Sequence, residues 1–489
     1  MPSNDRLSRW LIAGGVGLCI TVLAAVIVVV ATGHVPSTSD TVNRRTSTQP
    51  TPTVLTSVGP SPSSSTSEPP QPPVDPLAEI DQAQLVACIR ATGALPGAHS
   101  QPDLTHLPAS HVVHLVARAD ESVRQLHFTA KVPFEFIHQK EMDRRVVHMS
   151  LASYGPAQAK SDSEILALLG AVPPATDLRT VAKQALGGQV AGFYDDRTRK
   201  LVVGTGGKQL SPSEVTTLAH ELDHALVDQG LGFPSLHDGS ALLADESLAR
   251  HALLEGDAVL DQTFFEFSYL SVDQQLQTSH DPAAARADRQ LAAVPHYLTA
   301  GFLFPYTAGL NFVCSLYLDG GWPAVDEAYF KPPTSTAQIM WPDRYRSHEA
   351  PVIPRPPETP AGWRVASRSA LGAADLKALF EAPGNDAARA LHNPQGRARA
   401  WAGGRVELFR AGQQSALAMD LVQHRHTHDL CSSIRSWYQR AFPDALVVAR
   451  SHHELSFDGT LDAASIRCTR GDVRLGIAPT ADVARALAL

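Results

Sequence analysis

Two histidines and a glutamate stand at a spacing that could bind and use a metal ion. In the run His-Glu-Leu-Asp-His, His220 and His224 are four residues apart, and Glu221 follows the first histidine. Residues four apart lie on the same face of a helix, so both imidazoles could bind one zinc ion at about 2.0–2.1 Å. The Glu221 carboxylate, turned by about 100° from His220, would lie beside the ion and could take a proton from zinc-bound water. The spacing therefore predicts metal-assisted hydrolysis with Glu221 as the general base.

The neighbouring residues specify the helix that must carry this run. Ser211 can cap the N-terminus, Pro212 suits the first turn, and Glu214 completes a capping box. Gly230 can adopt the left-handed conformation that ends a helix. Apolar side chains at helical spacing would face the core, namely Val215, Leu218, Ala219, Leu222, Ala225 and Leu226. We therefore expect a helix here, and a helix whose histidines bind no metal stays open as the alternative.

A catalytic zinc site needs a third protein ligand and an open position. In a second long helical pattern downstream, Glu255 is followed by Gly256. A glycine inside a helix costs about 1 kcal/mol relative to alanine, and the close approach of a neighbouring helix or ligand would explain it. Glu246 and Asp245 are alternative ligands, but Arg250 follows Glu246 by four residues, which favours an exposed ion pair. We therefore expect Glu255 to be the third ligand.

This motif, with the downstream run Leu-Glu-Gly-Asp-Ala around Glu255, resembles the gluzincin branch of zinc metallopeptidases. The resemblance covers residues 160–350 well and extends to uncharacterised, membrane-anchored bacterial members. It implies that His220, His224 and Glu255 bind one Zn²⁺ ion, that Glu221 is the general base, and that the substrate is a peptide or protein. A catalytically inactive, metallopeptidase-like surface protein that binds a partner or scaffolds the envelope is the alternative.

The resemblance also implies two flanking features. An edge strand at Lys200 to Gly204 would pair with the extended backbone of the substrate, although ordinary sheet pairing explains this strand equally well. The run Pro-Tyr-x-x-Gly, read as the entrance to a helix, resembles a segment that places a tyrosine near the zinc. Tyr306 would then donate a hydrogen bond to the developing oxyanion, or else its hydroxyl bonds a loop carbonyl. The chain has Ala337 and Trp341 where the bacterial members tend to have Glu and His.

The N-terminal residues point to a membrane anchor. Residues 10–32 form an uncharged apolar run long enough to cross a membrane as a helix. Arg6 and Arg9 precede it, so residues 1–9 are expected in the cytoplasm and the rest outside. Residues 33–76 are rich in Ser, Thr and Pro, which is typical of a disordered linker. We therefore expect a single-pass membrane protein with an extracytoplasmic catalytic domain. A cleaved signal peptide is the alternative and places the domain on the same side.

Two folded units are predicted after the linker, and the predicted fold class is α+β. Residues 77–355 would form a zincin-like catalytic domain, in which a small sheet packs against the two ligand-bearing helices. Residues 365–489 would form a small α+β domain that includes paired strands at 405–409 and 415–422. The formal net charge of −8 shows no basic excess, so we expect no nucleic-acid partner.

Four cysteines lie outside the predicted membrane span, an even number that suits an oxidising compartment. Four cysteines allow three pairings, and we expect Cys431 to pair with Cys468 because both lie in the C-terminal segment. Four buried free thiols are the alternative. None of the cysteines has CxxC spacing, so a cysteine-based metal or redox site is not expected.

Overall fold

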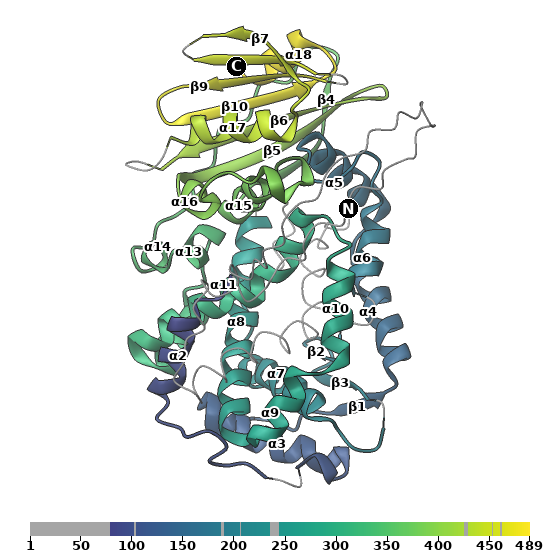
Figure 1. Ribbon diagram of the computed structural model, residues 1–489, viewed down its shortest axis with the longest axis vertical. Coiled ribbons are helices and arrows are strands. Elements are labelled where there is room, and N and C mark those ends of the chain that lie inside the picture. Colours follow the sequence, from purple (N-terminus) through teal and green to yellow (C-terminus); the bar gives the residue numbers. More distant parts are fainter. Residues whose placement is uncertain are drawn as a thin grey trace, which may run out of the picture.

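The computed structural model describes residues 79–101, 104–186, 190–205, 207–234, 244–424, 429–451, 453–459 and 462–489. The predicted cytoplasmic residues, membrane span and Ser/Thr/Pro linker lie outside the described residues. The described chain mixes helices with two sheets, so the predicted α+β class is confirmed (Figure 1).

Helices make up most of the first two thirds of the described chain. The larger sheet and its helices form one end of the molecule, and the smaller sheet lies near the other end (Figure 1). The helices before the linker to the larger sheet are α2 (Gln82–Ala91), α3 (Ala109–Arg124), α4 (Gln139–Ser153), α5 (Pro156–Leu168), α6 (Leu178–Leu186), α7 (Pro212–Gly230), α8 (Ala244–Tyr269), α9 (Val272–Ser279), α10 (Pro282–Leu291), α11 (His296–Gly320), α12 (Trp322–Phe330), α13 (Thr336–Met340) and α14 (Pro342–Arg346).

The smaller sheet has three strands in the order β1-β3-β2. The hairpin of β2 and β3 is antiparallel, and β1 pairs with the other side of β3 in parallel. The expectation that Lys200 to Gly204 forms an edge strand is therefore wrong, because that strand, β3, is central. The strands are β1 (Phe134–Ile137), β2 (Gly192–Asp195) and β3 (Lys200–Gly204).

The helix that carries the histidine motif forms as its local signals predict. The Ser211 hydroxyl accepts a hydrogen bond from the Glu214 amide at 3.2 Å, and the Glu214 carboxylate accepts one from the Ser211 amide at 2.7 Å. Pro212 begins α7, and all six predicted core residues are buried. The helix ends at Gly230 as expected, but the residue with left-handed geometry is Gly232, with φ of 78°. The predicted position of the left-handed residue was therefore wrong by two residues.

Two long helices cross at a pair of glycines in the middle of the molecule. Helices α8 and α11 pack against each other along their length (Figure 1). A Cβ on Gly256 would collide with the backbone carbonyl of Gly309, and a Cβ on Gly309 would collide with the carbonyl of Ala252. The glycine inside α8 is therefore explained by a neighbouring helix, one of the two explanations that the sequence offered.

The larger sheet has seven strands in the order β4-β5-β6-β10-β9-β8-β7. Its core includes residues 154–178 as well as residues 371–477, so helix α5 packs with the C-terminal unit. The strands are β4 (Arg364–Ala370), β5 (Trp401–Ala411), β6 (Gln414–Gln423), β7 (Leu446–Arg450), β8 (Glu454–Asp458), β9 (Ala463–Cys468) and β10 (Asp472–Ala478). The accompanying helices are α15 (Ala373–Glu381), α16 (Pro394–Ala398), α17 (Leu430–Ala441) and α18 (Ala481–Leu487).

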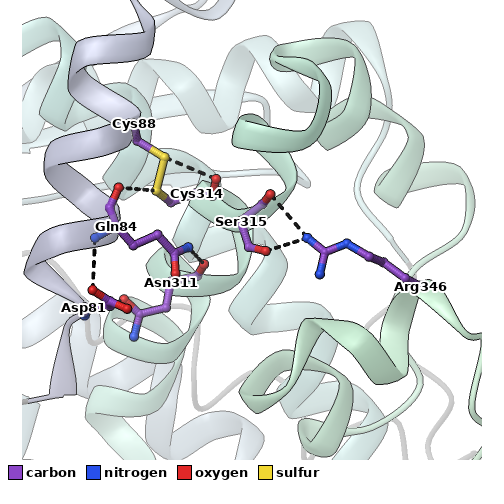
Figure 2. The surroundings of a disulfide bond; sticks show 7 residues. All are labelled: Asp81, Gln84, Cys88, Asn311, Cys314, Ser315 and Arg346. Atoms are coloured by element: carbon purple, nitrogen blue, oxygen red, sulfur yellow. Dashed lines mark hydrogen bonds between the residues drawn. A yellow bond between two sulfur atoms is a disulfide. The ribbon is translucent and has the colours of Figure 1, made fainter.

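Two disulfides join distant parts of the chain. The expected bond between Cys431 and Cys468 is present. The second bond, between Cys88 and Cys314, ties α2 to α11 (Figure 2). Beside it, the Gln84 side chain donates a hydrogen bond to the Asn311 carbonyl at 2.6 Å. The first described helix is thus fixed to a central helix of the fold.

Helix α11 is long and apolar enough to cross a membrane by length and composition. Its most apolar stretch is 61% buried inside the protein, which is typical of a helix in a folded core. The predicted membrane span at residues 10–32 is a different segment.

Candidate metal centre

Helices α7 and α8 bring together the three predicted metal ligands. The Nε2 atoms of His220 and His224 lie 3.2 and 3.6 Å from the same oxygen of Glu255, Oε2. One ligand atom from each of the three residues lies within 4.8 Å of the other two. All three side chains are buried. The i, i+4 spacing on α7 and the facing position on α8 therefore give one compact set of nitrogen and oxygen donors.

The Glu255 carboxylate is held in its charged form. Burial raises the pKa of this carboxyl, but the imidazoles of His220, His224 and His251 outweigh burial and hold the pKa well below its ordinary value. Its Oε2 atom is buried and has no hydrogen bond among the described residues. A charged oxygen that faces two imidazole nitrogens and lacks a hydrogen bond is suited to bind a cation.

The alternative ligands lie elsewhere and have other partners. Asp245 is buried and accepts hydrogen bonds from the amide and hydroxyl of Thr336. Glu246 forms the expected ion pair with Arg250. The side chains of Glu246 and Arg250 are only 20% and 16% exposed, so the predicted exposure of this ion pair is wrong. Of the candidate acids, it is Glu255 that the fold brings to the histidines.

Glu221 lies between the motif helix and the smaller sheet. Its Oε2 accepts a hydrogen bond from the backbone amide of Tyr194 in β2 at 2.7 Å. Burial raises the pKa of this carboxyl, and the nearby His220 and His224 offset part of the rise. A Cβ on Gly192 would lie 3.3 Å from the Glu221 Cγ, so the glycine lets β2 approach the carboxylate closely. The site therefore has a second carboxylate, fixed by a backbone amide and with an increased affinity for a proton.

The ring of Tyr306 lies against the first histidine. The ring centroids of Tyr306 and His220 are 6.5 Å apart, with an interplanar angle of 28°, and Tyr306 is buried. Pro305 lies inside α11, which begins at His296, so the expectation that this run opens a helix is wrong. The tyrosine is nevertheless brought to the site, because Gly309, one turn further on, lets α11 pack closely on α8.

The sequence analysis missed one residue of the site, His251. Its Nε2 lies 2.9 Å from Glu255 Oε1. His220 and His224 contact the other oxygen of this carboxylate, Oε2. His251 is four residues before Glu255, so the i, i+4 spacing that drew attention to the motif was also available here. We call His251 and the three predicted ligands the histidine–glutamate cluster. Its members are His220, His224, His251 and Glu255.

A second buried cluster lies on other faces of the same two helices. The Arg124 guanidinium binds both oxygens of Asp257 at 2.9 and 3.0 Å, and it contacts Asp326 at 2.7 Å. Its Cζ lies 4.3 Å from the ring centroid of Trp322. Arg124 thus connects α3 with α8 and α12. We call Arg124 and five nearby aspartates the arginine–aspartate cluster. The aspartates are Asp120, Asp223, Asp257, Asp261 and Asp326.

Three of these aspartates have no hydrogen bond among the described residues. Asp120, Asp223 and Asp261 are fully buried, and neither oxygen of any of them has such a partner. Burial is the main reason that their pKa values lie well above the ordinary value, and neighbouring aspartates raise them further. These carboxyls therefore hold a proton to higher pH than ordinary aspartates do.

Ligand histidines usually donate their other nitrogen to a carboxylate or carbonyl, but two aspartates near the motif have other partners. Asp228 instead accepts a hydrogen bond from the Tyr194 hydroxyl at 2.8 Å, and Asp257 binds Arg124. Within the described residues, the Nδ1 atoms of His220 and His224 have no hydrogen-bond partner. Within the described residues, the hydrogen bond that supports a predicted ligand is therefore made to Glu255, by His251. No protein-family model, curated protein or solved structure matches the chain, so the chemistry of the site rests on its own residues.

Proposed function

We propose that the protein is a zinc-dependent hydrolase that cleaves peptide bonds. The observation that carries the proposal is the convergence of His220, His224 and Glu255, with Glu221 beside them. Two imidazole nitrogens and one carboxylate oxygen form a donor set typical of catalytic zinc, which keeps its fourth position open. The Oε2 of Glu255, buried and without a hydrogen bond in the described part of the chain, fits such an ion, whereas a structural zinc site would be closed by four protein ligands.

The residues around the three ligands suit hydrolysis. A bound zinc ion would polarise the substrate carbonyl and make water more acidic. The Tyr194 amide holds the Glu221 carboxylate in one position. The raised pKa of Glu221 favours uptake of a proton from water and its transfer to the leaving amine. Tyr306, whose ring lies beside His220, is our candidate for the hydrogen bond to the oxyanion.

An extended peptide is the substrate that suits the neighbouring sheet. Strand β2 pairs with β3 on one side and has no strand partner on the other within the described chain. The Tyr194 amide points away from β3, toward Glu221. An open strand edge beside the general base can add a peptide strand through main-chain hydrogen bonds. We therefore assign substrate pairing to β2 in place of β3.

Metal analysis and one conservative variant test this proposal. The full-length protein, stripped with a chelator and reloaded, should bind one zinc per chain. Glu221→Gln should keep that zinc and lose hydrolysis of unfolded peptides by about 10²–10⁴-fold, because it removes the proton acceptor and no ligand. His220→Ala is the matched control and should lose zinc as well. Absence of stoichiometric zinc in the wild type would contradict the metal assignment. An active Glu221→Gln protein would contradict the general base, and a zinc-loaded wild type without hydrolysis would favour a binding protein.

We also propose that residues 10–32 anchor the protein and that the metal centre lies outside the cytoplasm. Two disulfides support this location, because such bonds persist in oxidising compartments and are rare in the cytosol. Protease added to intact cells should degrade the folded part of the protein. Protection equal to that of a cytosolic control would contradict the proposed location.

A further inference from the structure

We propose that His251 is a positioning residue that decides which oxygen of Glu255 faces the metal. This inference rests on the proposed function, since it assigns a role within the same site. It concerns a side chain that the motif does not contain and that lies on the other ligand-bearing helix, α8.

The two oxygens of Glu255 have different neighbours. Oε2 faces the Nε2 atoms of His220 and His224 at 3.2 and 3.6 Å. Oε1 lies 2.9 Å from the Nε2 of His251, within hydrogen-bond distance. Oε1 therefore has a hydrogen-bond partner, and Oε2 has none among the described residues. The carboxylate is oriented with Oε2 as the ligand atom.

The burial of His251 indicates which of its nitrogens carries the proton. Its Nδ1 is buried and has no hydrogen-bond partner in the described part of the chain. A proton there would be a buried donor without an acceptor, which costs about 1–3 kcal/mol. A proton on Nε2 instead points at a charged oxygen 2.9 Å away. The geometry therefore assigns the donor role to the His251 Nε2 and the acceptor role to Oε1.

His251 lies outside the set of ligands. The ligand atoms that lie within 4.8 Å of one another belong to His220, His224 and Glu255, and His251 is not a member of this set. By engaging Oε1, His251 would limit Glu255 to one oxygen as a ligand for a bound ion. A second carboxylate oxygen on the ion would fill the position that catalysis needs for water. The role of His251 is thus to preserve the open position as well as to fix the carboxylate.

This arrangement reverses a common pattern in metal sites. Ligand histidines usually donate their other nitrogen to a carboxylate or carbonyl, and losing such a partner typically costs 10–100-fold in metal affinity. Here the Nδ1 atoms of both ligand histidines lack a partner among the described residues, and the supporting hydrogen bond is made to the glutamate. Removing the His251 hydrogen bond should therefore lower metal affinity by the amount typical for losing a residue that hydrogen-bonds a metal ligand.

Two substitutions separate hydrogen bonding from packing. His251→Phe fills the same space without a donor, and His251→Gln keeps an N–H that can reach Oε1. We expect the zinc dissociation constant of the full-length protein to rise about 10–100-fold in the Phe variant, whereas the Gln variant should stay close to wild type. Zinc affinity is measured by competition with a chromophoric chelator. The cobalt(II) absorption spectrum of each variant reports whether four-coordinate geometry is kept, and we expect it to change in the Phe variant alone.

The controls distinguish failure of this inference from failure of the proposed function. Urea unfolding in the presence of a chelator verifies that each metal-free variant folds, and His251→Leu replaces the Phe variant if the larger ring prevents folding. A donor-free variant that binds zinc as tightly as wild type, with an unchanged cobalt spectrum, would overturn the role of His251 alone. So would an equal loss of affinity in the Gln variant. A wild-type protein that binds no zinc would overturn the proposed function itself.

Discussion

Helices α7 and α8 contribute to two buried charge clusters with opposite balances of charge. In the histidine–glutamate cluster, one carboxylate faces three imidazoles, and its pKa is held well below the ordinary value. In the arginine–aspartate cluster, five carboxyls surround one guanidinium. Burial raises the pKa of Asp120, Asp223 and Asp261 well above the ordinary value. In the first cluster the surroundings favour a charged oxygen, and in the second burial favours the protonated form of the excess carboxyls.

Both ligand-bearing helices carry residues of the two clusters. On α7, Asp223 of the second cluster lies between His220 and His224 of the first. On α8, Asp257 follows Glu255 by two residues. Arg124 binds Asp257 and lies 3.7 Å from Asp223, so it connects both ligand-bearing helices. We infer that the first cluster would bind the proposed metal ion and that the second fixes the helices that carry it.

Removing the central residue of the arginine–aspartate cluster should have the largest effect. Arg124→Met leaves Asp257 and Asp326 without their buried cation. Breaking a buried ion pair from one side costs about 3–5 kcal/mol, so we expect a loss of that size in the free energy of unfolding. Urea unfolding at neutral pH in the presence of a chelator measures it.

The matched variant in the histidine–glutamate cluster should behave differently. Glu255→Gln leaves three imidazoles that can be neutral, so the metal-free protein should lose only about 1 kcal/mol, the net value of a hydrogen bond. The added stability that zinc gives the wild type by binding the folded state should disappear. If both variants cost the metal-free protein the same free energy, the two clusters would not differ in the way proposed.

A substitution between the clusters should disturb both of them. Gly256 lies between Glu255 and Asp257, and a Cβ there would collide with the Gly309 carbonyl. Forcing an extra group into a packed core costs typically 1–3 kcal/mol, so Gly256→Ala should destabilise the protein by about that amount. It should also weaken zinc binding, because α8 must move relative to α11. Gly301→Ala on α11, where a Cβ would meet nothing within 4 Å, is the control and should change neither property. Normal zinc affinity in a destabilised Gly256→Ala protein would contradict the coupling.

The parts of the site that the sequence predicted depend on local signals. The capping box at Ser211 and Glu214 uses side chains three residues apart, and it forms as expected. The two motif histidines share one helical turn, so the helix itself sets their spacing. Glu255 was identified because Gly256 needed an explanation, and the α8–α11 crossing supplies it. These inferences needed little knowledge of distant contacts.

The features that the sequence did not predict depend on residues far apart in the chain. Strand β3 is central because β1 pairs with it in parallel, which is decided some 60 residues earlier in the sequence. Pro305 suggested the start of a helix, since a proline inside one costs about 3 kcal/mol, but the packing of α11 outweighs that cost. Strand β9 begins with two alanines, which are poor strand formers, and it was not predicted from the sequence. The arginine–aspartate cluster joins α3, α8 and α12, so no single segment reveals it.

The effect of Asp261→Asn on the free energy of unfolding depends on pH and is smallest near pH 4. Burial raises the pKa of Asp261 well above 3.8, so the folded protein keeps a proton that the unfolded chain releases above about pH 4. The wild type is therefore fully stabilised below that pH and loses stability as the pH rises, at up to about 1.4 kcal/mol per unit. Asparagine resembles the protonated acid, so the variant should match the wild type near pH 4 and become the more stable of the two at higher pH.

Urea unfolding between pH 5 and 8, in the presence of a chelator, follows this difference. Asp257→Asn is the matched control: its carboxylate binds Arg124 at both oxygens, so its loss should destabilise the protein throughout the range. Parallel pH profiles for wild type and Asp261→Asn would mean that Asp261 is ionised in the folded state. The arginine–aspartate cluster would then carry a buried charge as the histidine–glutamate cluster does, and the contrast between them would no longer separate the residues that bind a cation from those that hold the helices in place.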